Sequence, residues 1–267
     1  MKMNLKFTIF SFLFVLFSSS FVTAEISMND AKVLLKKAED NTAFYETDFS
    51  GKYVVVQDKP GEGKSITEAI MYRRDRTGQW TVLVTGPDSE KGKGYLQTDG
   101  SIWFYDPADR RFTFTSAKDK FQGTNLNNSD FAPQRYYSDY NIESAKEEKL
   151  GSLHCVVFTL KANKKNVDYP KLKIWVTKDD GLVRKKEDYS LSGQLLRTTA
   201  IPSYQILQSK GRTYAIPEKM LLIDNLRGKK INGKVHYEKS QVTISKISFD
   251  KVENIVYTKP YLEMMSK

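Results

Sequence analysis

Cysteine and histidine, the side chains that most often form covalent links or bind transition metals, are scarce in this sequence. The chain of 267 residues contains one cysteine, Cys155, and two histidines, His154 and His236. A single cysteine cannot form an internal disulfide, and the apolar residues around Cys155 predict a small buried side chain. The two histidines lie far apart in the chain, and neither has a second ligand at metal-binding spacing. The sequence therefore predicts no metal centre, no cofactor and no internal disulfide.

The motifs of nucleophilic and metal-assisted hydrolysis are also missing. The sequence has no G-x-S-x-G pattern and no H-E-x-x-H pattern. The glycines at residues 91–94 precede a predicted strand, so no helix N-terminus follows them to receive a phosphate. The acidic residues form no informative pair, although the facing carboxylates of a glycosidase are not visible in one sequence. We therefore predict that the protein is not an enzyme, with a hydrolase of unrecognised type as the alternative.

Long hydrophobic runs are absent except at the N-terminus. Two lysines there precede an apolar and hydroxyl-bearing run at residues 7–17, and small residues at Val22 and Ala24 follow. This order is typical of a secretory signal peptide, and the run is shorter than the ~20 residues of a membrane-spanning helix. Glu25 stands where a lipoprotein would have a cysteine. We predict a signal peptide at residues 1–24 and a soluble mature protein in the periplasm; an uncleaved anchor is the alternative.

Acidic residues are outnumbered by basic ones. The chain has 42 Lys and Arg against 32 Asp and Glu, which gives a formal net charge of +10. In a cytoplasmic protein this charge would point to nucleic acid, but we expect no nucleic-acid partner for a secreted protein. An anionic lipid or a membrane surface is the acidic partner that an envelope compartment offers. The alternative is a solvated lysine-rich surface that keeps the protein in solution.

One helix is expected near the start of the mature chain. Ser27 and Asp30 have the spacing of a capping box in its acidic form. Apolar residues then recur at helical spacing, namely Ala31, Leu34, Leu35 and Ala38. Because this apolar stripe is narrow, the helix must pack on a larger surface.

From residue 49 onward, the sequence predicts strands. Segments rich in Val, Ile, Thr and aromatic residues alternate with turns that contain Gly, Asp, Asn or Pro. The predicted strands are residues 49–57, 66–74, 80–85, 101–106, 111–116, 153–160, 171–177, 182–190, 194–207, 214–224 and 235–249. The short connections indicate an antiparallel meander rather than βαβ units. Residues 119–139 have no strand pattern and are predicted as a lid or a short helix over the sheet, within a single domain at residues 25–267.

Several predicted strands are apolar on both faces. Residues 102–105 (IWFY) need a core on one side and a second apolar surface, or a ligand, on the other. A change of apolar parity at Ser245 and Lys246 predicts a β-bulge, which bends a sheet toward a barrel. A curled sheet leaves an apolar cleft, in which an acyl chain of ~15 methylenes would gain on the order of 10 kcal/mol. The residues predicted to line this cleft are Tyr53, Val55, Ile70, Tyr72, Val82, Val84, Trp103, Tyr105, Phe112 and Phe114.

Two segments resemble a known family. Residues 99–107 (DGSIWFYDP) resemble the D-G-x-x-[LI]-W-F-Y-[ND]-P segment of LolA, the periplasmic lipoprotein carrier, with one spacer residue fewer. Arg110, Arg111 and residues 121–131 (FQGTNLNNSDF) resemble a branch of outer-membrane lipoprotein-sorting proteins, which has F-x-G-[ST]-[DN] followed by an acidic and an apolar residue. The order of signal peptide, helix, meander, loop and further strands is similar over most of the mature chain.

The resemblance implies a mainly β fold with a few helices: an incomplete, open antiparallel β-barrel with a helical lid over an apolar cavity. It implies a monomeric carrier that takes a lipidated protein from an inner-membrane transporter and delivers it to an outer-membrane acceptor. In the family an arginine on an early strand helps to close the lid, and residues 69–75 (AIMYRRD) place it at Arg74, with Asp75 where the family has proline.

The cargo and the exact role stay open at this point. Because the chain is longer than the carrier, a phospholipid or another lipid is an alternative cargo. Two other roles are compatible with the same fold. One is a regulatory module that senses lipids or lipoproteins, and the other is an accessory lipid-binding protein of a resistance-nodulation-division exporter.

Overall fold

The structure, a computed structural model, describes residues 26–266, so the predicted signal peptide lies outside the described residues. Two α-helices, α1 (Met28–Asp40) and α2 (Lys259–Met265), accompany thirteen strands in the described part of the chain. The strands are β1 (Phe49–Lys59), β2 (Gly63–Arg74), β3 (Gln79–Gly86), β4 (Gly94–Thr98), β5 (Ser101–Asp106), β6 (Arg111–Thr115), β7 (Tyr140–Leu150), β8 (Leu153–Ala162), β9 (Lys171–Thr177), β10 (Val183–Tyr189), β11 (Leu195–Ser209), β12 (Arg212–Ile231) and β13 (Lys234–Ser248).

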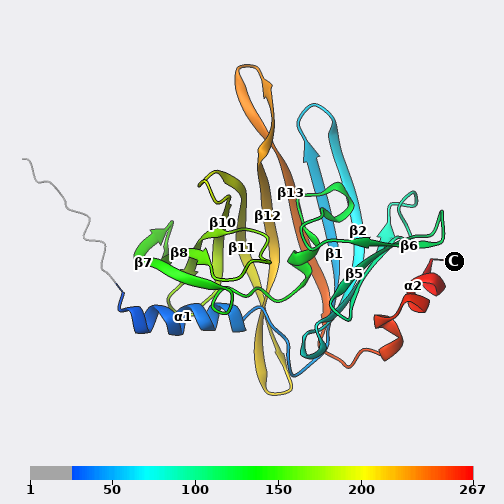
Figure 1. Cartoon of the computed structure of the whole chain (residues 1–267), viewed down its shortest axis with the longest axis horizontal. Coiled ribbons are helices and arrows are strands. Elements are labelled where there is room, and N and C mark those ends of the chain that lie inside the picture. The colour runs from blue at the N-terminus through cyan, green and yellow to red at the C-terminus, as the bar shows by residue number, and fades with distance from the viewer. Residues whose placement is uncertain (1–25, 267) are drawn as a thin grey trace, which may run out of the picture.

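All thirteen strands belong to one antiparallel sheet that does not close (Figure 1). Its order is β6-β5-β4-β3-β2-β1-β13-β12-β11-β10-β9-β8-β7, so two meanders meet where the first strand pairs with the last. At this junction Val55 on β1 lies opposite Val242 on β13. Strands β6 and β7 form the two free edges, and the predicted open antiparallel barrel is confirmed.

Helix α1 begins and packs as its sequence predicts. The Ser27 side chain accepts a hydrogen bond from the backbone N–H of Asp30 at 3.1 Å, which caps the first turn. The four predicted apolar positions, Ala31, Leu34, Leu35 and Ala38, are buried. They pack against inner-face residues of β8 and β9, among them Phe158 and Ile174. The helix therefore covers the meander that ends at β7 (Figure 1).

The predicted bulge lies in β13. Ser50 on β1 pairs with Ser248, whereas Lys52 pairs with Ser245, so β13 has one extra residue there. Lys246 adopts a positive φ of 52°, a conformation that allows the extra residue to leave the ladder. The bulge bends the sheet at the junction of its two halves.

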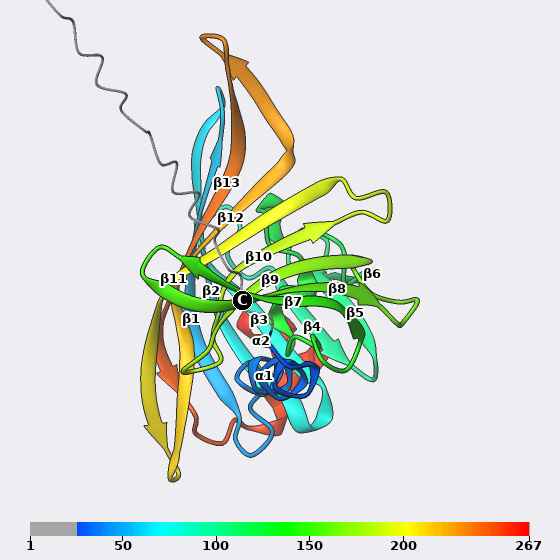
Figure 2. The same cartoon turned by 90° about the vertical axis from the view of Figure 1, so that its left-hand side faces the viewer.

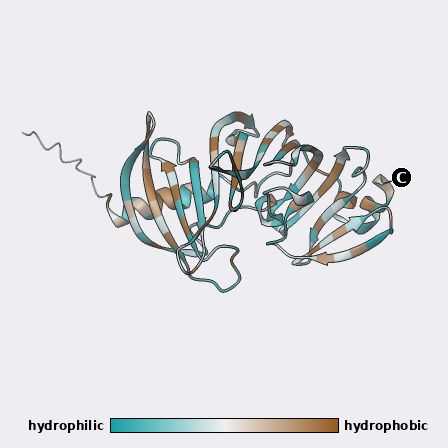
Figure 3. Ribbon diagram, turned by 90° about the horizontal axis from the view of Figure 1, so that it is seen from above, coloured by the Kyte–Doolittle hydropathy of each residue, from teal (hydrophilic) through white to brown (hydrophobic). Residues whose placement is uncertain are grey.

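The second apolar face of β3, β4 and β5 is covered by the C-terminal segment. On the inner face, Ile102 belongs to the main core. On the outer face, Leu96 and Tyr105 pack against Tyr257 and Leu262, which belong to η4 (Asn254–Tyr257) and α2. Viewed from above, hydrophobic and hydrophilic residues alternate along the strands of both halves (Figure 3). The chain itself therefore supplies the second surface that the residues 102–105 require.

Candidate functional site

The connection between β6 and β7 crosses the concave face of the sheet. Since these strands are the two opposite edges, residues 116–139, here called the crossover segment, must span from one half to the other. The segment contains two short 3-10 turns, η2 (Phe121–Gly123) and η3 (Asn128–Phe131). The Phe131 ring lies 5.7 Å from Trp80 and 6.1 Å from Tyr53, measured between ring centroids. The segment predicted as a lid or short helix thus lies over the sheet without forming an α-helix.

A buried arginine on β11 holds the crossover segment. Arg197 donates to both carboxylate oxygens of Asp130, at 2.6 and 3.0 Å, and to Asp188 at 2.8 Å. It also donates to the backbone carbonyl of Asn125 at 3.2 Å. Burial alone would raise the pKa of the Asp130 carboxyl, but the charge of Arg197 lowers that pKa below its usual value. Asp130 and Arg197 are therefore both charged and hold two distant parts of the chain together.

Two further contacts fix the segment to the last two strands. Lys120 donates to Asp224 on β12 at 2.6 Å, and the backbone N–H of Asn125 donates to the Ser240 hydroxyl on β13 at 2.8 Å. Ser240 is fully buried, and its hydroxyl in turn donates to Gln57. Polar contacts from Lys120, Asn125 and Asp130 thus hold the same stretch of the crossover segment that Phe121 and Phe131 anchor in the core.

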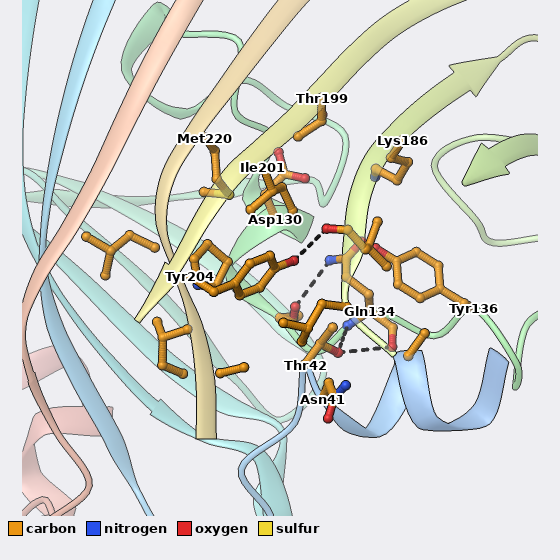
Figure 4. A pocket seen from close by; sticks show the side chains of 18 of the residues that line it. Asn41, Thr42, Asp130, Gln134, Tyr136, Lys186, Thr199, Ile201, Tyr204 and Met220 are labelled. Atoms are coloured by element: carbon orange, nitrogen blue, oxygen red, sulfur yellow. Dashed lines mark hydrogen bonds between the residues drawn. The ribbon is translucent and has the colours of Figure 1, made fainter. Parts of the chain in front are cut away.

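A cavity of about 140 Å³ lies between the end of α1, the crossover segment and strands β1 and β10 to β13 (Figure 4). Most of its wall is apolar. The apolar lining residues are Ala38, Phe44, Phe49, Tyr53, Leu126, Ala132, Leu182, Val183, Ile201, Ala215, Ile216, Pro217, Met220, Leu222 and Ile244. The remaining lining residues are Asn41, Thr42, Arg73, Asp130, Gln134, Tyr136, Lys186, Thr199 and Tyr204.

Polar side chains lie at two parts of the wall: Asn41, Thr42 and Gln134 beside the end of α1, and Lys186 and Thr199 farther from it, on β10 and β11 (Figure 4). The backbone N–H of Gln134 donates to the Thr42 hydroxyl at 2.9 Å, which links the end of α1 to the crossover segment. Tyr204 donates its hydroxyl to the backbone carbonyl of Val183 at 2.6 Å. In contrast, the Thr199 hydroxyl is buried and has no hydrogen-bond partner among the described residues. A buried polar atom without a partner is available to a ligand group.

The volume limits what the cavity accepts in this conformation. Its 140 Å³ is close to that of an engineered protein cavity that binds benzene. An acyl chain of ~15 methylenes is several times larger than benzene and needs more room. Since the sheet is held by continuous strand pairing, the crossover segment and the end of α1 are the parts of the wall that can move without breaking it.

The predicted lining residues separate into three groups. Tyr53 lines the cavity, and Val55, Val82 and Val84 lie on the same concave face in the main core. Tyr72, Tyr105 and Phe112 face the other way and pack with the C-terminal segment, and Ile70 shares a strand face with Tyr72. Trp103 lies under the Lys259 ammonium, 3.5 Å from its ring centroid, and Phe114 is 69% exposed. The cavity is instead lined mainly by the later strands, β10 to β13.

Arg74, which the resemblance places at the lid latch, contacts the other end of the chain. Its guanidinium donates to Asp48 at 2.8 and 3.1 Å and to the Asn254 side chain at 2.7 Å. It also lies over the Tyr257 ring, 4.5 Å from the centroid. Arg74 therefore holds the C-terminal segment, while Arg197 holds the crossover segment. Strand alternation places Arg197 on one face with Thr199, but no local pattern reveals its carboxylate partners.

The two histidines and the cysteine are not among the residues that line the cavity. His154 and His236 are exposed, and Cys155 is buried in the sheet, where burial raises the pKa of its thiol. No cluster of three metal-binding side chains occurs in residues 26–266. Within the same range, no helix is long and apolar enough to cross a membrane.

The open sheet, its crossing segment and its apolar hollow define a LolA-like fold. A LolA superfamily protein from Nitrosomonas europaea superimposes with a TM-score of 0.69 at 22% identity, over 86% of this chain and 98% of the other. An outer membrane lipoprotein-sorting protein domain from Vibrio parahaemolyticus superimposes with a TM-score of 0.69 at 17% identity, over 87% of this chain and 97% of the other. A DUF1329 family protein from Desulfovibrio piger superimposes with a TM-score of 0.71 at 16% identity, over 88% of this chain and 98% of the other.

The family itself follows from the sequence. A family model described as "Uncharacterized protein" matches residues 77–264, which is more than half of the chain, and the protein belongs to this family. No curated protein matches the chain. The matched region begins within η1 (Asp75–Thr77) and ends in α2. It therefore includes the crossover segment and most of the strands that line the cavity.

Proposed function

We propose that the protein binds the acyl chains of a lipoprotein or another lipid in this cavity and carries them through the periplasm toward the outer membrane. The observation that carries the proposal is a largely apolar cavity beneath a segment that joins the two free edges of an open sheet. An inner-membrane transporter would load the monomeric carrier, and an outer-membrane acceptor would unload it.

The energetics of binding favour an acyl ligand. Each methylene moved from water into an apolar site contributes ~0.8 kcal/mol, and part of this gain is offset by ordering the chain and moving the crossover segment. Because these costs lower the net binding free energy, the ligand can dissociate again, and a carrier must release its cargo. The partnerless Thr199 hydroxyl and the nearby Lys186 ammonium favour a ligand that has an ester or another oxygen-bearing group beside its hydrocarbon chain.

A size block in the cavity tests the proposal. Met220 lines the cavity and is half-buried at the border of the main core, so Met220→Trp would fill part of the space while an apolar side chain stays against the core. We expect its affinity for a fluorescent fatty acid to fall at least tenfold. Met264→Trp is the matched control because Met264 is exposed on α2, away from the cavity.

Two readouts complete the test. Mass spectrometry of the gently purified protein should detect bound lipid in the wild type and in Met264→Trp, but not in Met220→Trp. Delipidated wild-type protein that fails to bind the fatty acid, or a Met220→Trp variant that binds it as tightly as the wild type, would refute the acyl-binding site.

A further inference from the structure

The β12–β13 hairpin extends beyond the rest of the sheet. The last residue of β1 that pairs with β13 is Asp58, opposite Lys239, and β11 pairs with β12 no further than Asp224. Among the described residues, no further strand pairs with the two-stranded ribbon of residues 225–238, and the Lys229 side chain lies against Gly61 in the β1–β2 turn. This ribbon projects from the molecule at the end opposite the β11–β12 turn (Figures 1 and 2). Here residues 225–239 are called the projecting hairpin.

The projecting hairpin is strongly basic. It contains four cations on its unpaired ribbon, Arg227, Lys229, Lys230 and Lys234, and a fifth at its base, Lys239 opposite Asp58, against one carboxylate, Glu238. All five cationic side chains belong to exposed residues. Within residues 26–266, none of the four lysines forms an ion pair, and Arg227 reaches Asp224 only at 3.8 Å. The charge is therefore free to attract an anionic surface.

Apolar side chains accompany these cations without a core to bury them. Val235 and Tyr237 flank Gly228 across the ribbon, where a Cβ would lie 2.8 and 3.0 Å from their side chains. Val235 is 54% exposed and Tyr237 36% exposed, and Leu226 at the base of the ribbon is 55% exposed. Lys230, opposite Val235 in the register, lies on the same face. Exposed apolar residues interleaved with lysines, with a tyrosine among them, are typical of segments that bind at a membrane interface.

We propose that the projecting hairpin docks the protein on an anionic lipid bilayer. A thin ribbon with cations on both faces has no groove for a folded partner, but it can lie on a flat anionic surface and insert Val235, Tyr237 and Leu226 among the headgroups. Near such a surface, each cation raises the affinity by roughly fivefold at physiological salt. This interaction does not depend on what the cavity binds.

The base of the projecting hairpin contacts the crossover segment, which covers the cavity. Asp224 at its base accepts from Lys120, and Ser240 at its other base accepts from the backbone of Asn125. Both donors belong to the crossover segment. Docking through the hairpin therefore brings the segment that covers the cavity next to the membrane.

Vesicle flotation of the full mature chain tests the docking proposal. We expect the wild type to float with phosphatidylcholine vesicles that contain roughly one-third phosphatidylglycerol, but not with pure phosphatidylcholine vesicles. The triple variant Lys229→Glu, Lys230→Glu, Lys234→Glu should bind the anionic vesicles at least ~30-fold more weakly. The double variant Val235→Ser, Tyr237→Ser should bind the anionic vesicles several-fold more weakly than the wild type, and its binding should still require anionic lipid.

A charge-matched control separates the hairpin from the net charge. Lys146, Lys149 and Lys161 are exposed on β7 and β8, and the triple change to glutamate alters the net charge by the same amount. This control should stay within about threefold of the wild type. Equal weakening of the control, unchanged binding of the hairpin variant, or no flotation of the wild type would each overturn the proposal. The hairpin variant should bind the fluorescent fatty acid normally, so failure of docking and failure of acyl binding are separate results.

Discussion

At the scale of single residues, Asp48 shows how a buried carboxylate makes stability depend on pH. Burial opposes its charge, but hydrogen bonds from Arg74, the backbone N–H of Val252 and Arg76 lower the pKa of Asp48 to about 2. The folded pKa is lower than the unfolded one, so the stabilisation is complete above the unfolded pKa of about 3.8 and is lost as pH falls through 2. A shift of this size corresponds to about 2 kcal/mol.

Urea denaturation of the wild type and Asp48→Asn at about pH 6 and pH 2.5 measures this contribution. The asparagine leaves Arg74 without its buried anion, so the variant should be less stable by at least ~2 kcal/mol near pH 6. The difference between the two proteins should shrink at the lower pH. A difference that is independent of pH would show that Asp48 is not the titrating group.

Thr199 offers a residue-scale test of the polar part of the cavity. Its hydroxyl is buried without a partner, and such a group costs ~1–3 kcal/mol. Thr199→Val keeps the shape of the side chain, so the ligand-free protein should gain ~1 kcal/mol in free energy of unfolding. If the hydroxyl bonds to a ligand ester, the same change should weaken binding of a fluorescent phospholipid several-fold. A destabilised variant would show instead that the free protein already satisfies this hydroxyl.

At the scale of elements, the C-terminal helix α2 depends on one glycine. Gly94 on β4 faces Leu262, and a Cβ at position 94 would overlap the Leu262 side chain. Gly94→Ala should therefore destabilise the protein by ~1–3 kcal/mol, because overpacking forces α2 away from the sheet. Leu262→Ala should cost ~2–5 kcal/mol by itself, since Leu262 is fully buried.

A double-mutant cycle identifies the cause. In the Leu262→Ala background the added methyl group has room, so the cost of Gly94→Ala should largely disappear. Denaturant midpoints of the four proteins give the coupling free energy. Additive costs would mean that Gly94 is needed for the backbone of β4 and not for the approach of α2.

Elements with local signals are predictable from the sequence, whereas exposed or short ones are not. The bounds of β5 and β9 agree with the pattern of apolar and aromatic residues, and the cap at Ser27 fixes the start of α1. Strand β7 has no such pattern, because an edge strand with polar or charged residues at seven of its eleven positions resembles a loop. Strand β4 is only five residues long, and α2 is a short helix that depends on tertiary packing.

At the scale of the whole molecule, the location of the cavity could not be predicted, because it depends on contacts between distant segments. Strand alternation separates the two faces of β2 but does not say which one the crossover segment covers. Tyr53 reaches the cavity because β1 pairs with β13, and Arg197 meets Asp130 because the chain crosses from edge to edge. Neither contact can be predicted from the local sequence. The curvature of the sheet can be predicted in part, because the sequence indicates the bulge at Lys246.

The size of the cavity requires that part of its wall moves when a long chain binds, and we expect the crossover segment to be that part. A disulfide between positions 125 and 240 would prevent that movement, because it would replace the hydrogen bond from the Asn125 N–H to the Ser240 hydroxyl, 2.8 Å long, by a covalent link to β13. The variant Asn125→Cys, Ser240→Cys, made with Cys155→Ala to avoid mispairing, serves as its own control after reduction. In the oxidised form, the affinity for the fluorescent fatty acid should fall at least tenfold, while benzene, which fits the closed cavity, should still bind. Reduction should restore long-chain binding. Equal affinity in both redox states would mean that the chain enters by displacing α1, which forms the other movable part of the wall.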